Sequence, residues 1–204
     1  MSHWDPDASS VAIVDAFLAH LDTPHVEEIR ARQAALLAAS GELPDPPARY
    51  NRRYTTAVLA AWEVLSPRFG PARHQDLLDL LREAFTAPFR EWTARSTREF
   101  LDGADDPFAA MAALAKKRET TDFGVEFTFD RDEGPAHLHQ DVRRCGYLEY
   151  LRGRGAAHLT PVLCAFDTAW LEAVDPARHG FVATRATTLA EGGPTCPFHF
   201  RRVR

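Results

Sequence analysis

Long apolar runs and blocks of basic residues are both missing from this chain. No apolar stretch approaches the roughly 18 residues that a membrane-spanning helix needs, so a membrane is not an expected partner. The net charge is −5 at pH 7, and no segment is rich in lysine or arginine. Because nucleic-acid-binding proteins normally present a basic stripe, nucleic acid is not an expected partner either.

Cysteine is scarce, and its count of three is odd. The first ten residues, MSHWDPDASS, lack the basic start and apolar stretch of a secretory signal, so we expect reduced thiols and a cytoplasmic location. Alanine, arginine and proline outnumber lysine, asparagine and isoleucine, which is typical of a GC-rich bacterial source. Nothing in the sequence sets the oligomeric state, and a homo-oligomer is compatible with it.

Several motifs that bind common cofactors are also missing. The chain contains no C-x-x-C pair, no H-E-x-x-H, no glycine-rich phosphate loop and no G-x-S-x-G. Dinucleotide-dependent, ATP-dependent and serine-hydrolase activities therefore have no support. We expect no cofactor, and a small molecule is the expected partner.

The first 120 residues have helical periodicity. Val11, Val14, Phe17 and Leu21 recur at helical spacing, and similar patterns follow further along the chain. The predicted helices span 9–21, 23–39 (opened by a Thr-Pro cap), 53–66, 71–100 (kinked or broken at the proline at position 88) and a segment that begins at 106–107. Residues 40–49 are predicted to form a proline-rich connector.

The pattern changes to strands at Gly124. Val125, Phe127 and Phe129 alternate, the sequence DEGP is a predicted turn, and the returning strand carries Leu138 and Val142 on one face. Two helical stretches (146–154 and 159–174) separate this hairpin from a second one, with strands over 181–189 and from 196. We predict an α+β fold in one domain, with a helical N-terminal half packed on an antiparallel sheet of about four strands.

Cys145 is the first candidate for chemistry. It lies where a predicted strand ends and a helix begins, beside Arg143 and Arg144. A helix N-terminus and nearby positive charge both stabilise a thiolate, the form that attacks electrophilic carbon. The alternative is that Cys145 is a small buried apolar residue, as most unpaired cysteines are.

Asp167 and Arg185 are the next candidates. Cys164 and Asp167 are three residues apart and thus share a face of the predicted helix, whereas Arg185 is in phase with apolar residues on its strand. An inward guanidinium could bind Asp167 or the carboxylate of a substrate. If these faces are instead solvated, both charged residues belong to the surface.

The returning strand of the first hairpin places His137, His139 and Asp141 on one face. Two histidines at this spacing can bind a metal ion, and Cys145 or Cys196 could complete a zinc site. That face is opposite Leu138 and Val142, so solvent exposure is the simpler interpretation. No metal site is therefore predicted.

In order along the chain, these residues resemble the L-2-amino-thiazoline-4-carboxylic acid hydrolase family. The family pattern is a strand ending in Arg-Cys, a Cys-x-x-Asp helix, and then R-x-x-T-x-x-x-G-x-x-x-C-x-F-x-F. The strings RRCGYLEYLRGRG, LCAFDTAWLE and RATTLAEGGPTCPFHF supply it over residues 144–203. The matching positions are Arg144, Cys145, Cys164, Asp167, Arg185, Thr188, Gly192, Cys196, Phe198 and Phe200.

The resemblance implies a hydrolase acting on a carbon–nitrogen bond of a small cyclic amidine. In the namesake reaction, water attacks the ring carbon that bears the amino group, and the thiazoline opens to a carbamoylated cysteine. The implied catalytic residues are Cys145, Asp167 and Cys164, and the implied substrate-binding residues are Arg185, Thr188, Arg144 and Cys196. Strand alternation would put Thr188 on the face opposite Arg185, so that one of the two serves the fold.

Two other functions stay open. The final motif also resembles 4-vinyl reductase-type domains, which suggests a non-catalytic binder of a small molecule, with cysteines that could hold a metal. A family member recruited to a biosynthetic pathway would instead act on another amidine, imine or amide, because fold and substrate separate readily.

Overall fold

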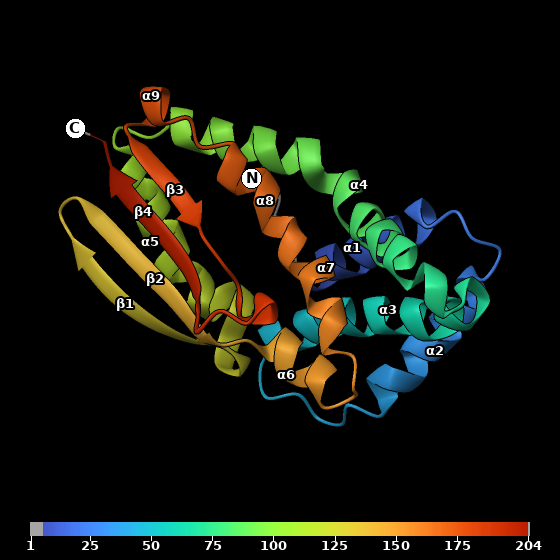
Figure 1. The fold of residues 1–204 in the computed structure, drawn as a ribbon. Helices are drawn as coiled ribbons and strands as arrows, with labels where there is room; N and C mark the ends of the chain where they lie inside the picture. Colours follow the sequence, from blue (N-terminus) through green and yellow to red (C-terminus); the bar gives the residue numbers. More distant parts are fainter. Residues whose placement is uncertain (1–5, 204) are drawn as a thin grey trace. The chain divides into compact units, whose positions relative to one another are not determined.

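The computed structural model describes residues 6–203 (Figure 1). These residues divide into two compact units. The first unit runs to Pro88 and includes Tyr147–Phe166, and the second comprises Phe89–Gly146 and the chain from Asp167 onward. Within the described residues, no helix combines the length and the apolar character that crossing a membrane requires. Each unit is described by itself below.

The first unit is helical. Its helices bury one apolar cluster, in which Phe17, Leu59, Leu81 and Leu151 are almost fully inaccessible to solvent. The elements are α1 (Pro6–His20), α2 (Val26–Ala38), α3 (Pro46–Phe69), η1 (Pro71–Arg73), the first part of α4 (His74–Asp102), most of α6 (Gly146–Arg152), η4 (Ala157–Leu159) and α7 (Thr160–Cys164). The helical periodicity of the N-terminal sequence thus marks the face that is buried.

Two predicted helix starts are wrong. Helix α2 begins at Val26, because the chain turns through Asp22 at a φ of 43° and the Thr23 hydroxyl accepts a bond from the His25 amide at 3.4 Å. Helix α3 begins inside the predicted connector, because Asp45 caps it by accepting the Ala48 amide hydrogen bond at 2.7 Å. The two prolines that follow Asp45 occupy the first turn, where an amide proton is not needed.

Helix α4 runs through Pro88 without ending, so the proline does not break it. The division between the two units nevertheless falls at this residue. The next predicted start is confirmed: Asp106 accepts the amide hydrogen bond of Ala109 at 3.0 Å, and α5 (Pro107–Arg118) begins with proline. Phe108 and Met111 are buried, and Leu114 packs beside them, as the apolar stripe predicts.

The second unit contains a four-stranded antiparallel sheet in the order β1-β2-β4-β3, which confirms the α+β fold (Figure 1). The strands are β1 (Thr128–Gly134), β2 (His137–Arg144), β3 (Phe181–Arg185) and β4 (Cys196–Arg202). Leu138, Phe181 and Phe200 from the sheet pack with Phe108 of α5 and Trp170 of α8 (Thr168–Glu172) in one core. The short helix α9 (Pro176–His179) leads into β3.

The start and the turn of the first hairpin differ from the prediction. After α5, a π-helical turn η2 (Glu119–Phe123) and a 3₁₀ turn η3 (Gly124–Glu126) precede β1, so the strand starts at Thr128. Gly124 takes a φ of 65° between the two turns, and Val125 is exposed rather than in line with Phe127. The hairpin turn is at positions 135 and 136, which follow Gly134.

The helix predicted over 159–174 is also divided. Helix α7 ends at Cys164, a 3₁₀ turn η5 (Ala165–Asp167) follows, and α8 begins at Thr168. The division between the units falls within η5, before Asp167. Cys164 therefore belongs to the first unit and Asp167 to the second.

Candidate functional site

One row of side chains on the core-facing side of the sheet is polar. Arg185 of β3 pairs with Phe198 of β4, Phe198 pairs with Gln140 of β2, and Gln140 pairs with Arg131 of β1. Paired residues in an antiparallel sheet point to the same face, so these four side chains form one cross-strand row. In the adjacent row, Ala183, Phe200 and Leu138 are apolar. On the other side, Val142 and Cys196 are buried as well, so this row places polar groups within a largely buried face.

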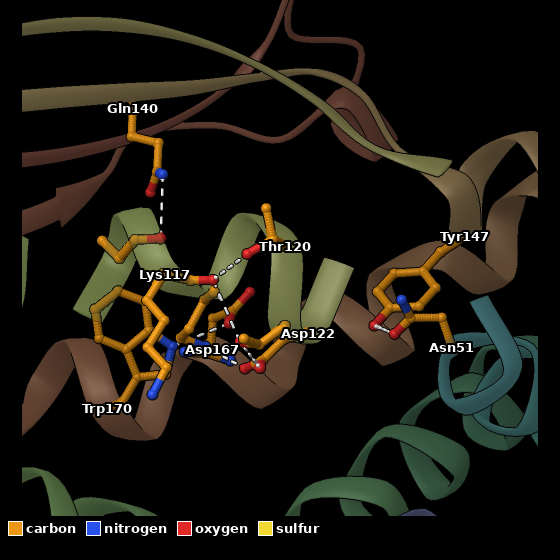
Figure 2. Close-up of polar contacts among 11 residues, drawn as sticks. Asn51, Lys117, Thr120, Asp122, Gln140, Tyr147, Asp167 and Trp170 are labelled. Atoms are coloured by element: carbon orange, nitrogen blue, oxygen red, sulfur yellow. Dashed lines mark hydrogen bonds and ion pairs between the residues drawn. The ribbon is translucent and has the colours of Figure 1, made fainter. Parts of the chain in front are cut away.

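Arg185 forms an ion pair with Asp167 across this row. Its Nη1 lies 2.7 Å from Asp167 Oδ2, and the two side chains are only 12% and 23% exposed. The other carboxylate oxygen accepts a hydrogen bond from Trp170 Nε1 at 2.9 Å (Figure 2). Of the two partners that the sequence allows for an inward Arg185, the structure thus supplies Asp167.

Aromatic rings form one side of this ion pair. The guanidinium carbon of Arg185 lies 5.4 Å from the ring centroid of Phe198, and the Trp170 and Phe198 rings stack at 5.8 Å with an angle of 19°. A guanidinium over an aromatic face gains a cation–π attraction, and the rings exclude water from one side of the charge. The pair is consequently held in a fixed orientation.

The loop between β3 and β4 accounts for the spacing of Thr188, Gly192 and Cys196 after Arg185. Strand β3 ends at Arg185, so the alternation argument that separates Arg185 from Thr188 is wrong. Thr188 is instead the N-cap of η6 (Leu189–Glu191). Its hydroxyl oxygen accepts a hydrogen bond from the Glu191 backbone N–H at 3.2 Å, and the hydroxyl donates one to the Glu191 carboxylate at 3.0 Å. This cap fixes the turn that brings the chain back to β4.

Two glycines complete the loop. Gly192 has a φ of 85°, a left-handed conformation that side chains other than glycine rarely adopt. A Cβ on Gly193 would lie 2.7 Å from the Thr187 side chain and 3.0 Å from the Thr188 carbonyl oxygen. The loop backbone is therefore tightly packed at Gly193, and its conformation sets the position of Arg185 relative to Cys196.

Cys196 is buried at the start of β4. Its sulfur accepts a hydrogen bond from the Leu189 amide at 3.1 Å, and burial raises the pKa of the thiol. The charges of Arg185 and Asp167 act on the same thiol in opposite directions, the arginine lowering its pKa and the aspartate raising it. Cys196 is a protonated thiol that packs beside the ion pair.

Cys145 lies between the end of β2 and the start of α6, as the sequence predicts, and is 8% exposed. Its two arginine neighbours have partners of their own. Arg143 Nε lies 2.5 Å from Asp130 Oδ2, and Arg144 donates to the carbonyl oxygens of Val125 and Glu126 at 2.8 and 3.2 Å. The guanidinium of Arg144 thus holds the turn before β1.

Sequence reasoning missed Gln140 and Glu119. Gln140 is 5% exposed, and its amide nitrogen donates to the Glu119 carboxylate and, at 3.3 Å, to the Ala115 carbonyl oxygen. Glu119 is 17% exposed and lies 3.4 Å from Arg131. A signal was present, because Gln140 is a polar residue in phase with Leu138 and Val142 on a predicted strand.

The second unit therefore brings together Arg185, Asp167 and Cys196 with Trp170 and Phe198. Val142, the register partner of Cys196, precedes Cys145 by three residues, so Cys145 follows β2 at the end of the sheet where β4 starts. Cys164, in the other unit, is partly exposed. Oppositely charged, half-buried groups beside an aromatic surface can bind a small molecule that carries both charges.

Metal-ligating side chains gather elsewhere. In the described part of the chain, the one group of three such residues with converging ligand atoms is Asp132, His137 and His139, and it contains no cysteine. The cysteine-based zinc site that the sequence left open is therefore not formed there.

The chain was compared with known proteins and families. No curated protein and no solved structure matches it. A family model, described as L-2-amino-thiazoline-4-carboxylic acid hydrolase, matches residues 50–200. This match extends well beyond the C-terminal motifs and takes in α3 to α5 as well as the sheet. The chain thus belongs to the L-2-amino-thiazoline-4-carboxylic acid hydrolase family.

Proposed function

We propose that this protein hydrolyses a small cyclic amidine that carries a carboxylate, such as 2-amino-thiazoline-4-carboxylate. The observation that supports this proposal most strongly is the Arg185–Asp167 ion pair on the aromatic surface of Trp170 and Phe198. The family name supplies the reaction class, and the ion pair supplies groups that match both ends of such a substrate.

The charges of the substrate and of the ion pair are complementary. A protonated amidine presents two N–H donors that fit a carboxylate, and a substrate carboxylate fits the fork of a guanidinium. In the proposed complex, the amidinium binds Asp167 and the carboxylate binds Arg185. One internal ion pair is thus replaced by two pairs to the substrate, and neither protein charge is left unpaired in a partly buried site.

Chemistry then takes place at the carbon between the ring nitrogen, the ring sulfur and the amino group. In the covalent route, the sulfur of Cys145 adds to this carbon, the tetrahedral adduct opens the ring, and the departing ring atom takes up a proton. Water then releases Cys145 and leaves a carbamoyl group, so that the net change is the addition of one water molecule. In the direct route, Asp167 removes a proton from the attacking water.

The remaining family positions have supporting roles in this proposal. Thr188 holds the loop that positions Arg185, and Cys196 packs beside the ion pair. Arg144 holds the turn before β1. This turn packs against Gly146, the residue after Cys145, since a Cβ on Gly146 would lie 2.8 Å from Glu126 Cβ. Cys164 is kept as a candidate second thiol of the reaction.

The test is turnover of 2-amino-thiazoline-4-carboxylate by the purified full chain, with product identified by mass spectrometry. Rupture of the ring carbon–nitrogen bond releases a primary amine, whereas rupture of the carbon–sulfur bond releases a thiol, so both products are assayed. We expect ring opening, and we expect R185Q to raise KM by roughly 10- to 100-fold, because it removes a charge-assisted bond worth about 1.5–3 kcal/mol. R143Q, which removes an exposed guanidinium of the same sheet, is the matched control and should leave KM unchanged.

Cysteine variants distinguish the two routes. C145S should abolish turnover while the circular dichroism spectrum stays that of the parent protein, and C164S and C196S measure the other two thiols on the same substrate. Full activity of C145S would exclude Cys145 as the nucleophile and leave the direct route. Absence of any ring opening by the parent protein would contradict the proposed substrate class.

A further inference from the structure

A row of metal-ligating side chains lies on the sheet face opposite the polar row. Asp132 of β1 pairs with His139 of β2, and His139 pairs with His199 of β4, so these three residues stand side by side on one face. His137 lies two residues before His139 on the same face of β2. The strand register therefore adds Asp132, a residue of the neighbouring strand, to the two histidines of β2.

The ligand atoms of three of these residues converge. One ligand atom each from Asp132, His137 and His139 lie within 4.8 Å of one another. Asp132 Oδ2 is 3.4 Å from His137 Nε2 and 3.8 Å from His139 Nδ1. Two ligands bound at about 2.0–2.1 Å to a tetrahedral zinc ion are themselves about 3.3–3.4 Å apart. Small side-chain movements would thus bring all three onto one ion.

The His137 and His139 rings lie close together, and the His137 nitrogen that faces Asp132 makes no hydrogen bond to the described residues. Their centroids are 4.9 Å apart, and the His137 ring lies over Gly134, where a Cβ would come within 2.8 Å of it. The Nε2 atom of His137, which faces Asp132 Oδ2 at 3.4 Å, is buried and makes no hydrogen bond to the described residues. A buried imidazole nitrogen without a hydrogen bond is costly unless another group, such as a metal ion, uses its electron pair.

His199 and Asp141 support the pair from β4 and from β2. The His199 ring stacks on His139 at 4.2 Å with an angle of 28°, and its Nε2 lies 2.9 Å from Asp141 Oδ1. The contact with Asp141 holds the His199 ring, and the His139 ring packs on it.

We propose that Asp132, His137 and His139 bind one divalent transition-metal ion of the Zn²⁺ or Co²⁺ type on this face of the sheet. Imidazole nitrogens select such ions over Mg²⁺ and Ca²⁺, which prefer oxygen ligands. Asp132 is 76% exposed, so water completes the coordination and the site stays open. The ion links β1, the edge strand, to β2, and it does so on the face away from Arg185 and Asp167.

Co²⁺ titration of the untagged full chain, stripped with a chelator, tests this site. Visible d–d absorption reports nitrogen ligation and coordination number directly, and Zn²⁺ is then measured by displacement of Co²⁺. We expect one Co²⁺ per chain, a loss of at least tenfold in affinity for D132N, and no saturable binding for H137Q/H139Q. Bound metal should also raise the thermal midpoint of the parent protein but not that of the double variant.

D130N is the matched control, because Asp130 lies on the same strand and face but is held by Arg143 at 2.5 Å. Its Co²⁺ affinity should equal that of the parent. Because the Asp132 side chain is largely exposed, D132N leaves the fold intact and decides the matter even where the histidine variants fold poorly. Absence of saturable Co²⁺ binding by the parent, or equal binding by D132N, overturns the proposal.

Discussion

The Arg185–Asp167 ion pair should contribute measurably to stability, in contrast to the other ion pairs of the sheet. Two unit charges about 4 Å apart attract by about 4 kcal/mol at an effective dielectric constant of about 20, and desolvation offsets part of this. The side chains of Arg185 and Asp167 are 12% and 23% exposed, which places the pair between fully buried and surface cases. We therefore expect a coupling free energy of about 2 kcal/mol.

A double-mutant cycle measures this coupling. The free energy of unfolding is measured in urea for R185M, D167N and the double variant. The interaction energy is the change in the double variant minus the sum of the changes in the two single variants. The Arg143–Asp130 pair of the same sheet is the matched control. Its side chains are 52% and 62% exposed, so its coupling should be no more than about 0.5 kcal/mol.

Comparison of the two coupling free energies tests whether partial burial strengthens the Arg185–Asp167 pair. A coupling of about 2 kcal/mol for Arg185–Asp167, with a much smaller one for Arg143–Asp130, is the expected outcome. Equal couplings would refute the argument that partial burial strengthens the first pair. D167N alone should cost more than R185M alone, because it leaves the guanidinium without its carboxylate in a site that water reaches poorly.

Two predictions concern the loop between β3 and β4. G193A should destabilise the protein by about 1–3 kcal/mol in urea unfolding, because its Cβ would meet the Thr187 side chain and the Thr188 carbonyl oxygen. G153A, where a Cβ would make ordinary contacts at 3.5 and 3.6 Å, should lose less stability, and equal losses would contradict the clash. Cys196 should react slowly with iodoacetamide at pH 8 in the folded protein and at the ordinary rate in urea, as followed by mass spectrometry. Fast alkylation of the folded protein would contradict the buried position of this thiol. Because burial raises the pKa of the Cys196 thiol, its protonated form contributes fully to the free energy of unfolding below the ordinary thiol pKa. That contribution is lost as the pH rises above it.

The sequence alone predicts those features that depend on neighbouring residues. Asp106 followed by proline marks the start of α5 correctly, because a cap and its helix lie within one turn of chain. The apolar phase of Leu138 and Val142 identifies the buried face of β2, and the order of Cys145, Asp167, Arg185 and Cys196 identifies the family. Periodicity puts Arg185 in phase with apolar residues but leaves open whether that face is buried, and its 12% exposure shows that the side chain points inward.

Positions of strand ends follow less well from local patterns. The run from Phe181 to Leu189 alternates throughout, yet β3 ends at Arg185 because Thr188 caps η6 and Gly193 packs against the preceding chain. The same holds at Gly124, where two irregular turns replace the first residues of the predicted strand. Hydrogen bonds made by side chains and glycine conformations thus override an alternation that is compatible with a strand.

Partners across the sheet depend on tertiary structure. The carboxylate that pairs with Arg185 cannot be predicted from local sequence, because Asp167 lies 18 residues away along the chain. Likewise, the pairing of Asp132 with His139 and of Gln140 with Phe198 depends on strand register, and a shift by one residue would put each side chain on the other face. The family and the fold class therefore follow from the sequence alone, whereas the burial of Arg185 does not. Which charges and ligands meet depends on the tertiary structure, because strand register joins residues that no local period relates.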